Sequence, residues 1–183
     1  SGMNANTRVF ISSLNKHFKS TDEGVILGKT NYDQQYFDTI EFVVRDIENF
    51  TIPDNIKQLS PYSFESCKSL ELIEISPKSK LTTICDYAFS GSSIKKITIP
   101  KHVKEIQSDS FSRCKQLRTV KFADDCELRI IGEYSFYGSN ISSITIPKHV
   151  EETQSHAFSS CEQLQTVKFA DDCELRIIGE YSF

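Results

Sequence analysis

Apolar residues recur along most of the chain in a fixed local pattern. One apolar residue is followed, after two intervening positions, by two apolar residues that flank a single polar one. The pattern begins at Ile47, Leu70, Ile94, Leu117, Ile141 and Leu164. In a β-strand, residues two apart point to the same side, so each closing apolar pair predicts a short strand with one buried face. A second apolar pair follows each strand, for example Val103 and Ile106, and predicts that the chain turns back into the interior.

A phenylalanine ends each of these units at a regular distance. The positions are Phe64, Phe89, Phe111, Phe136, Phe158 and Phe183, so that spacings of 25 and 22 residues alternate. The combined period is 47 residues, and the eighteen-residue segment TVKFADDCELRIIGEYSF is repeated without change at 119–136 and 166–183. Self-similarity at a short fixed period is typical of a solenoid, in which each coil packs only against its neighbours. The sequence therefore predicts six stacked coils with a continuous column of phenylalanines inside.

The first 46 residues do not share the repeat and are interpreted as an N-terminal capping region. Ser1–Gly2–Met3 has the appearance of a tag remnant before a native start. The apolar residues between Val9 and Phe18 have the spacing of a short amphipathic helix. Two strands are expected after it, near 25–27 and 37–44.

The repeat resembles a known family. The run I-x-x-I-T-I-P-x-x-V-x-x-I-x-x-x-[AS]-F-x-x-C is carried by 94–114 and, with one departure, by 141–161, and it is similar to the BspA-like leucine-rich repeats. These occur in surface proteins of anaerobic bacteria and of protist parasites. The departures are Thr153 in place of an isoleucine, and Ser92 and Ser139 in place of cysteines in the longer units. The resemblance implies a right-handed leucine-rich-repeat solenoid of the α/β type, dominated by strands, over residues 47–183.

The same resemblance implies a non-catalytic binding surface for adhesion to host or extracellular matrix proteins or to other cells. It also implies a cell-surface or secreted location. The alternative is an intracellular scaffold that recruits a protein partner. That alternative is favoured if Met3 is the initiator, because the following residues do not form a secretory signal. It is favoured also by six cysteines that the repeat leaves unpaired, which are usual in a reducing compartment.

Composition and charge exclude several other classes of function. A formal net charge of −4 without a polybasic block argues against nucleic-acid binding. The chain contains no apolar run long enough to enter a membrane. It lacks a nucleophile elbow, a phosphate loop and a supported acid–base pair, so we expect no catalysis and no cofactor.

The cysteines, histidines and acidic clusters have structural interpretations that we favour over metal binding. Equivalent cysteines such as Cys67 and Cys114 are two coils apart, about 10 Å at the usual strand spacing, which is too far for a disulfide. They are expected to be small buried thiols, and the position shared by Cys85, Gly132 and Gly179 is expected to need a small residue. Three further groups are expected to be solvated: the equivalent turn histidines His102 and His149, the variable His156, and the two ADDCE segments at 123–127 and 170–174.

The outward side of the predicted strands is the candidate protein-binding surface. Its central column comprises Thr51, Glu74, Thr98, Lys121, Thr145 and Lys168. A flanking column comprises Asn49, Leu72, Lys96, Thr119, Ser143 and Thr166. Repeat solenoids present such ladders to protein partners. Because both columns lack aromatic and arginine side chains, which dominate interface energies, an ordinary solvated face remains the alternative.

Two further features bear on partners. Tyrosines two residues before four of the phenylalanines form a second column, which we interpret as packing rather than as an interface: Tyr62, Tyr87, Tyr134 and Tyr181. The last unit ends at Phe183 with no polar unit after it, although repeat arrays need capping units. This predicts either a piece of a longer array or a homodimer through the C-terminal end. Glycosylation at the sequons of Asn49 and Asn140 stays open.

Overall fold

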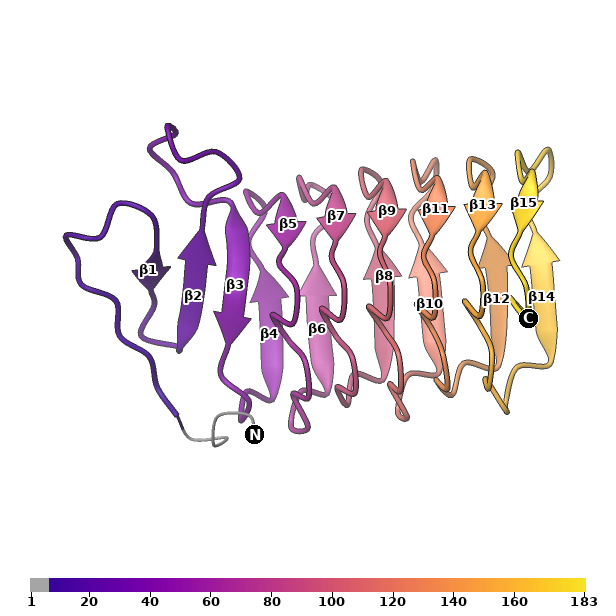
Figure 1. The fold of residues 1–183 in the computed structure, drawn as a ribbon, viewed down its shortest axis with the longest axis horizontal. Helices are drawn as coiled ribbons and strands as arrows, with labels where there is room; N and C mark the ends of the chain where they lie inside the picture. The colour runs from indigo at the N-terminus through magenta and orange to yellow at the C-terminus, as the bar shows by residue number, and fades with distance from the viewer. Residues whose placement is uncertain (1–6) are drawn as a thin grey trace.

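The computed structural model describes residues 7–183, which form an elongated stack of coils (Figure 1). The segment interpreted as a tag remnant lies outside the described residues. Each coil contributes one four-residue strand and one two-residue strand. The four-residue strands are β4 (Asn49–Ile52), β6 (Leu72–Ile75), β8 (Lys96–Ile99), β10 (Thr119–Phe122), β12 (Ser143–Ile146) and β14 (Thr166–Phe169). The two-residue strands are β5 (Gln58–Leu59), β7 (Thr83–Ile84), β9 (Glu105–Ile106), β11 (Ile130–Ile131), β13 (Glu152–Thr153) and β15 (Ile177–Ile178). The solenoid expected from the periodicity is therefore confirmed, and within residues 7–183 it contains no helix.

The two-residue strands continue a sheet that begins in the N-terminal region. Its order is β1-β2-β3-β5-β7-β9-β11-β13-β15, where β1 is Lys19–Ser20, β2 is Val25–Gly28 and β3 is Thr39–Val43. β1, β2 and β3 pair antiparallel, and all later neighbours pair parallel. β2 and β3 overlap the two strands expected near 25–27 and 37–44. Their place at one end of the sheet supports the proposal that the N-terminal region caps the repeats, as far as it is described, from residue 7 to residue 46.

The four-residue strands pair only in twos. β4 pairs with β6, β8 with β10 and β12 with β14, all parallel and in register. No ladder pairing joins β6 to β8 or β10 to β12 in the described chain; we call these two places the β6/β8 seam and the β10/β12 seam. The loops after β6 and β10, residues 76–82 and 123–129, are each two residues longer than the loops after β4 and β8, residues 53–57 and 100–104. A shorter loop therefore follows the first strand of each pair, and a longer loop follows the second strand, next to the seam.

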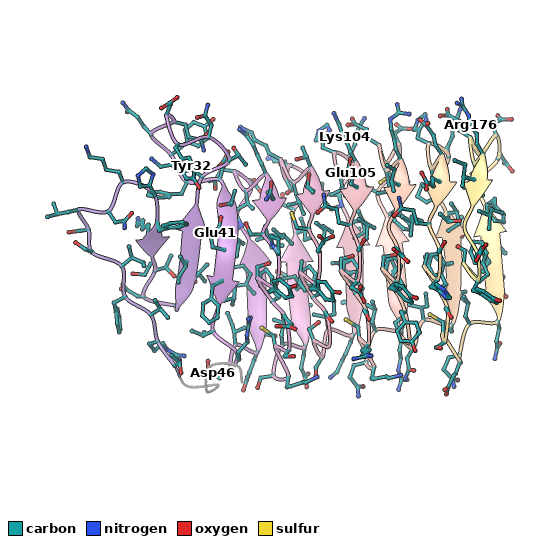
Figure 2. All side chains as sticks on the ribbon, in the orientation of Figure 1. Tyr32, Glu41, Asp46, Lys104, Glu105 and Arg176 are labelled. Atoms are coloured by element: carbon teal, nitrogen blue, oxygen red, sulfur yellow. The ribbon has the colours of Figure 1, made fainter. Side chains whose placement is uncertain are left out.

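The phenylalanine column forms the centre of the core. Five of its rings are at most 1% exposed: Phe64, Phe89, Phe111, Phe136 and Phe158. Successive rings are stacked with centroids 4.8 to 5.3 Å apart, up to the half-exposed Phe183. Isoleucine, leucine and valine side chains of both strand types surround the column in one cluster, and Figure 2 shows the side chains along the stack. The expected phenylalanine column is confirmed.

The prediction of a short helix between Val9 and Phe18 is wrong. Residues 9–18 have no regular secondary structure, and the Asn15 side chain accepts hydrogen bonds from the backbone nitrogens of His17 at 2.8 Å and Phe18 at 2.9 Å. Such local side-chain bonds compete with helical ones. The apolar residues that suggested the helix do not reach the core, since Phe10 is 82% and Leu14 87% exposed. A short helix without a packed apolar face is only marginally stable in water.

The residue that precedes each phenylalanine of the column is small and buried, and its replacement is expected to change stability. This position is buried in every coil and is either alanine, as at Ala88, or serine, as at Ser110 and Ser135. The Oγ atoms of Ser110 and Ser135 have no hydrogen-bond partner. Ser110→Ala is therefore expected to raise the free energy of unfolding by about 1 kcal/mol, because an unpaired hydroxyl leaves the core. Urea denaturation measures the change, and the reverse change Ala88→Ser is the matched control, expected to lower stability. A loss of stability in Ser110→Ala would contradict the assignment.

Candidate protein-binding face

The strand face is the outward side of the six four-residue strands. Along β4, β8 and β12 buried and exposed residues alternate, as the period of two requires, whereas in β14 of the last coil Val167 is only partly buried and Phe169 is exposed. All nine residues singled out from the sequence are exposed: Thr51, Glu74, Lys96, Thr98, Thr119, Lys121, Thr145, Thr166 and Lys168. The structure therefore places these candidates together on one solvent-facing surface.

The register makes neighbours of residues that are far apart in the chain. Thr98 lies opposite Lys121 on β10, and Thr145 lies opposite Lys168 on β14. In the first pair of strands the Thr51 hydroxyl donates a hydrogen bond of 3.4 Å to a carboxylate oxygen of Glu74. The central column is thus a repeated threonine–charge pair, acidic in the first pair of strands and basic in the next two.

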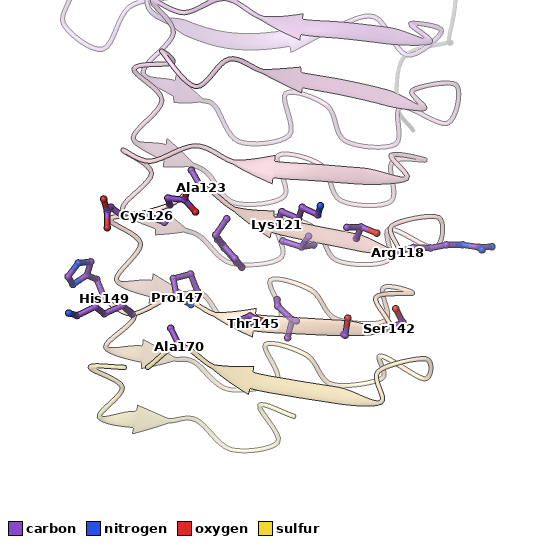
Figure 3. A pocket seen from close by; sticks show the side chains of 17 residues that line it. Arg118, Lys121, Ala123, Cys126, Ser142, Thr145, Pro147, His149 and Ala170 are labelled. Atoms are coloured by element: carbon purple, nitrogen blue, oxygen red, sulfur yellow. The ribbon is translucent and has the colours of Figure 1, made fainter. Parts of the chain in front are cut away.

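Each seam carries a groove in the strand face. At the β10/β12 seam a groove of about 560 Å³ has Val120 and Ile144 among its lining residues, with Lys121 and Thr145 beside it (Figure 3). Two loops at the ends of the strands, around Ala123 and around Pro147, extend the same groove. A second groove of about 500 Å³ lies at the β6/β8 seam and includes residues of β6, β8 and β10. The sequence did not predict these grooves, since they arise where neighbouring strands are not paired.

The strand face is basic although the chain as a whole is acidic. From β8 to β14 the outward side chains are serine, threonine and three lysines, with no carboxylate among them. Lys96, Lys121 and Lys168 make no ion pair within residues 7–183 at 4.0 Å or less. Their ammonium groups are therefore free to meet carboxylates of a partner, in a chain whose net charge is −4.

The turn histidines have partners that the sequence reasoning missed. Nδ1 of His102 lies 3.1 Å from Oε1 of Glu127, and Nδ1 of His149 lies 3.0 Å from Oε1 of Glu174. Each glutamate belongs to the next coil, 25 residues later, within an ADDCE segment. Both histidines are partly exposed, as expected, but these segments are not wholly solvated loops, since one carboxylate of each joins two coils.

The tyrosine column packs as expected, and His156 is part of it. Tyr62 stacks on Tyr87 with centroids 5.0 Å apart. Further along, His156 lies between Tyr134 at 4.6 Å and Tyr181 at 5.2 Å, nearly parallel to both. His156 is partly exposed at a position that varies between coils, as expected, but the sequence reasoning missed that its ring stacks between two tyrosines.

The cysteines are free thiols, five of them buried. The thiol of Cys114 donates to the carbonyl oxygen of Phe89 at 3.1 Å, and that of Cys161 donates in the same way to Phe136 at 3.1 Å. Burial raises the pKa of the Cys114 thiol to about 11, and burial likewise raises that of Cys85 to about 11. These thiols therefore remain protonated near neutral pH, as expected of core residues and not of nucleophiles.

The described residues show neither a cluster of metal ligands nor a helix that could span a membrane. Within residues 7–183 no three His, Cys, Asp or Glu side chains are grouped closely enough to hold a metal ion. The described part of the chain also has no helix of the length and apolar character needed to span a membrane.

Comparison with known proteins identifies related repeats. The sequence model of the family described as the BspA type leucine rich repeat region matches residues 36–128 and 82–183. No curated protein matches the chain in sequence.

Solved structures share the fold at low sequence identity. A leucine-rich repeat protein from Eubacterium ventriosum is 21% identical with a TM-score of 0.74, over 96% of this chain and 51% of that protein. The pneumococcal vaccine antigen PcpA is 18% identical with a TM-score of 0.70, over 92% of this chain and 52% of its own. A leucine rich cell surface protein from Faecalibacterium prausnitzii is 19% identical with a TM-score of 0.53, over 89% of this chain and 56% of its own. The chain thus spans about half the length of each of these structures.

Proposed function

Because the chain belongs to the BspA-type leucine-rich repeat family, we propose that it is a non-catalytic module whose strand face binds a partner protein. The observation that carries the proposal is the ladder of nine exposed candidates with a groove at each seam. Repeat solenoids use such extended surfaces for recognition. Threonine hydroxyls and unpaired lysines suit a partner segment that offers carboxylates and backbone carbonyls.

We propose further that the protein acts at the cell surface as an adhesin, with host or extracellular matrix proteins as its partners. Two similar structures support this proposal, one described as a cell surface protein and one as a vaccine antigen. An intracellular scaffold is the second candidate function. The free buried thiols favour it, because unpaired cysteines are usual in a reducing compartment.

Antibody labelling of intact source cells separates the two candidates. The adhesin proposal predicts staining of unpermeabilised cells, with permeabilised cells as the control for total protein. Staining that appears only after permeabilisation would contradict the adhesin proposal and leave the scaffold.

Charge reversal on the strand face tests the binding surface itself. The triple change Lys96→Glu, Lys121→Glu and Lys168→Glu is expected to weaken binding to a partner found among matrix proteins by about tenfold or more, because like charges then meet at the interface. The matched control reverses three exposed lysines outside the strand face, Lys101, Lys104 and Lys115; Lys104 lies beside the two-residue strands (Figure 2). Biolayer interferometry compares the variants. Equal losses in both would contradict the proposal.

We also propose that isolated copies of this chain pair through the last coil, whose apolar side chains are exposed; coverage by further coils of a longer array is the alternative in the whole protein. Ile177 is 53%, Ile178 58% and Phe183 47% exposed, and an uncovered strand edge favours pairing between chains. Sedimentation velocity is expected to show a dimer that Ile178→Glu dissociates. A monomer at every concentration would contradict this proposal without affecting the strand face.

A further inference from the structure

The aromatic stack beside the two-residue strands has one position per coil and one interruption. The positions are 62, 87, 109, 134, 156 and 181, which hold Tyr, Tyr, Asp, Tyr, His and Tyr. All six residues have positive φ, between 52° and 63°. This left-handed conformation is uncommon for residues other than glycine, and here it is repeated in every coil. The six side chains therefore leave the backbone in the same way, and Asp109 occupies a rung where the other coils place a ring.

The equivalent position one period later, His156, shows that a flat ring fits between two tyrosine rings of the stack. His156 is the equivalent of Asp109 one 47-residue period later, and its ring is sandwiched between Tyr134 and Tyr181. At the Asp109 rung the flanking rings are Tyr87 and Tyr134. With one coil between them, these two residues are about 10 Å apart along the stack at the usual strand spacing. Among the described residues no aromatic ring stacks between Tyr87 and Tyr134, so the aromatic stack is interrupted at Asp109; Tyr134 there meets only the edge of Tyr137, at 5.6 Å. We call this interruption the gap.

The charge at the gap is negative. The Asp109 carboxylate raises the pKa of the Tyr87 phenol through its charge and through a hydrogen bond, so the two groups lie close together. The backbone N–H of Asp109 donates at 2.9 Å to the carbonyl oxygen of Glu133, the residue that precedes Tyr134 in the chain. Among residues 7–183 Asp109 makes no ion pair, and Arg113, four residues later, lies over neither flanking ring.

We propose that this gap binds the guanidinium group of an arginine side chain from a partner protein. A guanidinium is flat like the imidazole that fills the equivalent rung, and it stacks on tyrosine faces with a cation–π attraction. The Asp109 carboxylate at the base of the gap supplies the counter-charge and accepts its N–H donors. A lysine ammonium offers the charge without the flat shape, and a neutral ring offers the shape without the charge. The site lies apart from the strand face and does not depend on what that face binds.

Titration of the full chain with N-acetyl-arginine amide tests the proposal by NMR of the tyrosine rings. Saturable shifts are expected at Tyr87 and Tyr134 and not at Tyr32, with weak affinity because one side chain makes few contacts. N-acetyl-citrulline amide, which has the same shape without the charge, is expected to bind about tenfold more weakly.

Two variants of Asp109 complete the test. Asp109→His copies the rung at His156, fills the gap with a ring and is expected to abolish the shifts. Asp109→Asn keeps the gap, removes the charge and is expected to weaken binding by about threefold to tenfold. Shifts that persist in Asp109→His, equal binding of citrulline, or no saturation would each overturn the proposal. The triple lysine variant of the strand face is expected to bind the arginine probe like the unchanged chain, so the two sites can fail separately.

Discussion

Replacing Phe111 with alanine is expected to lower the free energy of unfolding by about 3–5 kcal/mol, the largest loss of any single change considered. The ring is fully buried and stacks between Phe89 at 5.2 Å and Phe136 at 5.1 Å. The coils above and below are held at the strand repeat by backbone hydrogen bonds, so the cavity cannot close. Urea denaturation followed by circular dichroism measures the loss.

Phe183→Ala is the matched control for this prediction. Phe183 belongs to the same column, but it is 47% exposed and stacks on only one member of the column, Phe158. Its removal is expected to cost less than half as much. Equal losses at the two positions would mean that the column does not hold the coils together.

Gly132→Ala is expected to cost about 3 kcal/mol, because the added methyl group meets backbone that cannot move aside. A Cβ atom on Gly132 would lie 2.7 Å from the carbonyl oxygen of Ile106 and 2.7 Å from the backbone carbon of Gln107. The Gly132 N–H donates to that same Ile106 oxygen at 2.8 Å. At the equivalent Cys85 the corresponding hydrogen bond is 3.1 Å long.

Gly138→Ala is the matched control, because it introduces backbone strain without the close backbone contact that Gly132→Ala creates. Gly138 has a φ of +62°, but the atom nearest to an added Cβ is the ammonium of Lys115 at 3.5 Å, which can move. This change is expected to cost about 1 kcal/mol from the left-handed conformation alone. Thermal unfolding of both variants checks the difference. A smaller loss for Gly132→Ala than for Gly138→Ala would contradict the interpretation.

The repeat itself could be predicted from the sequence because its signals are local and recur. The apolar pairs place the six four-residue strands, and the phenylalanines place the centre of the core. Outward residues such as Lys121 and Thr145 follow from the period of two. Each of these predictions depends on residues within one coil. The same residues recur in enough coils that a single departure, such as Thr153, does not hide the pattern.

What the sequence did not predict depends on contacts between coils. The seams arise from strand pairing across coils, and the partner of His102 lies 25 residues away in the next coil. The aromatic rung at His156 became recognisable only once its two tyrosine neighbours were placed. The helix expected near Leu14 failed for a related reason, because an apolar spacing forms a helix only where a core receives its apolar face.

Hydrogen exchange of the chain with and without its bound partner is the most direct test of the strand face as the binding surface. Slower amide exchange is expected in β10 and β12, which contribute residues to the groove of about 560 Å³ at their seam, with no change in the two-residue strands. Protection confined to the two-residue strands, with the strand face unchanged, would contradict it.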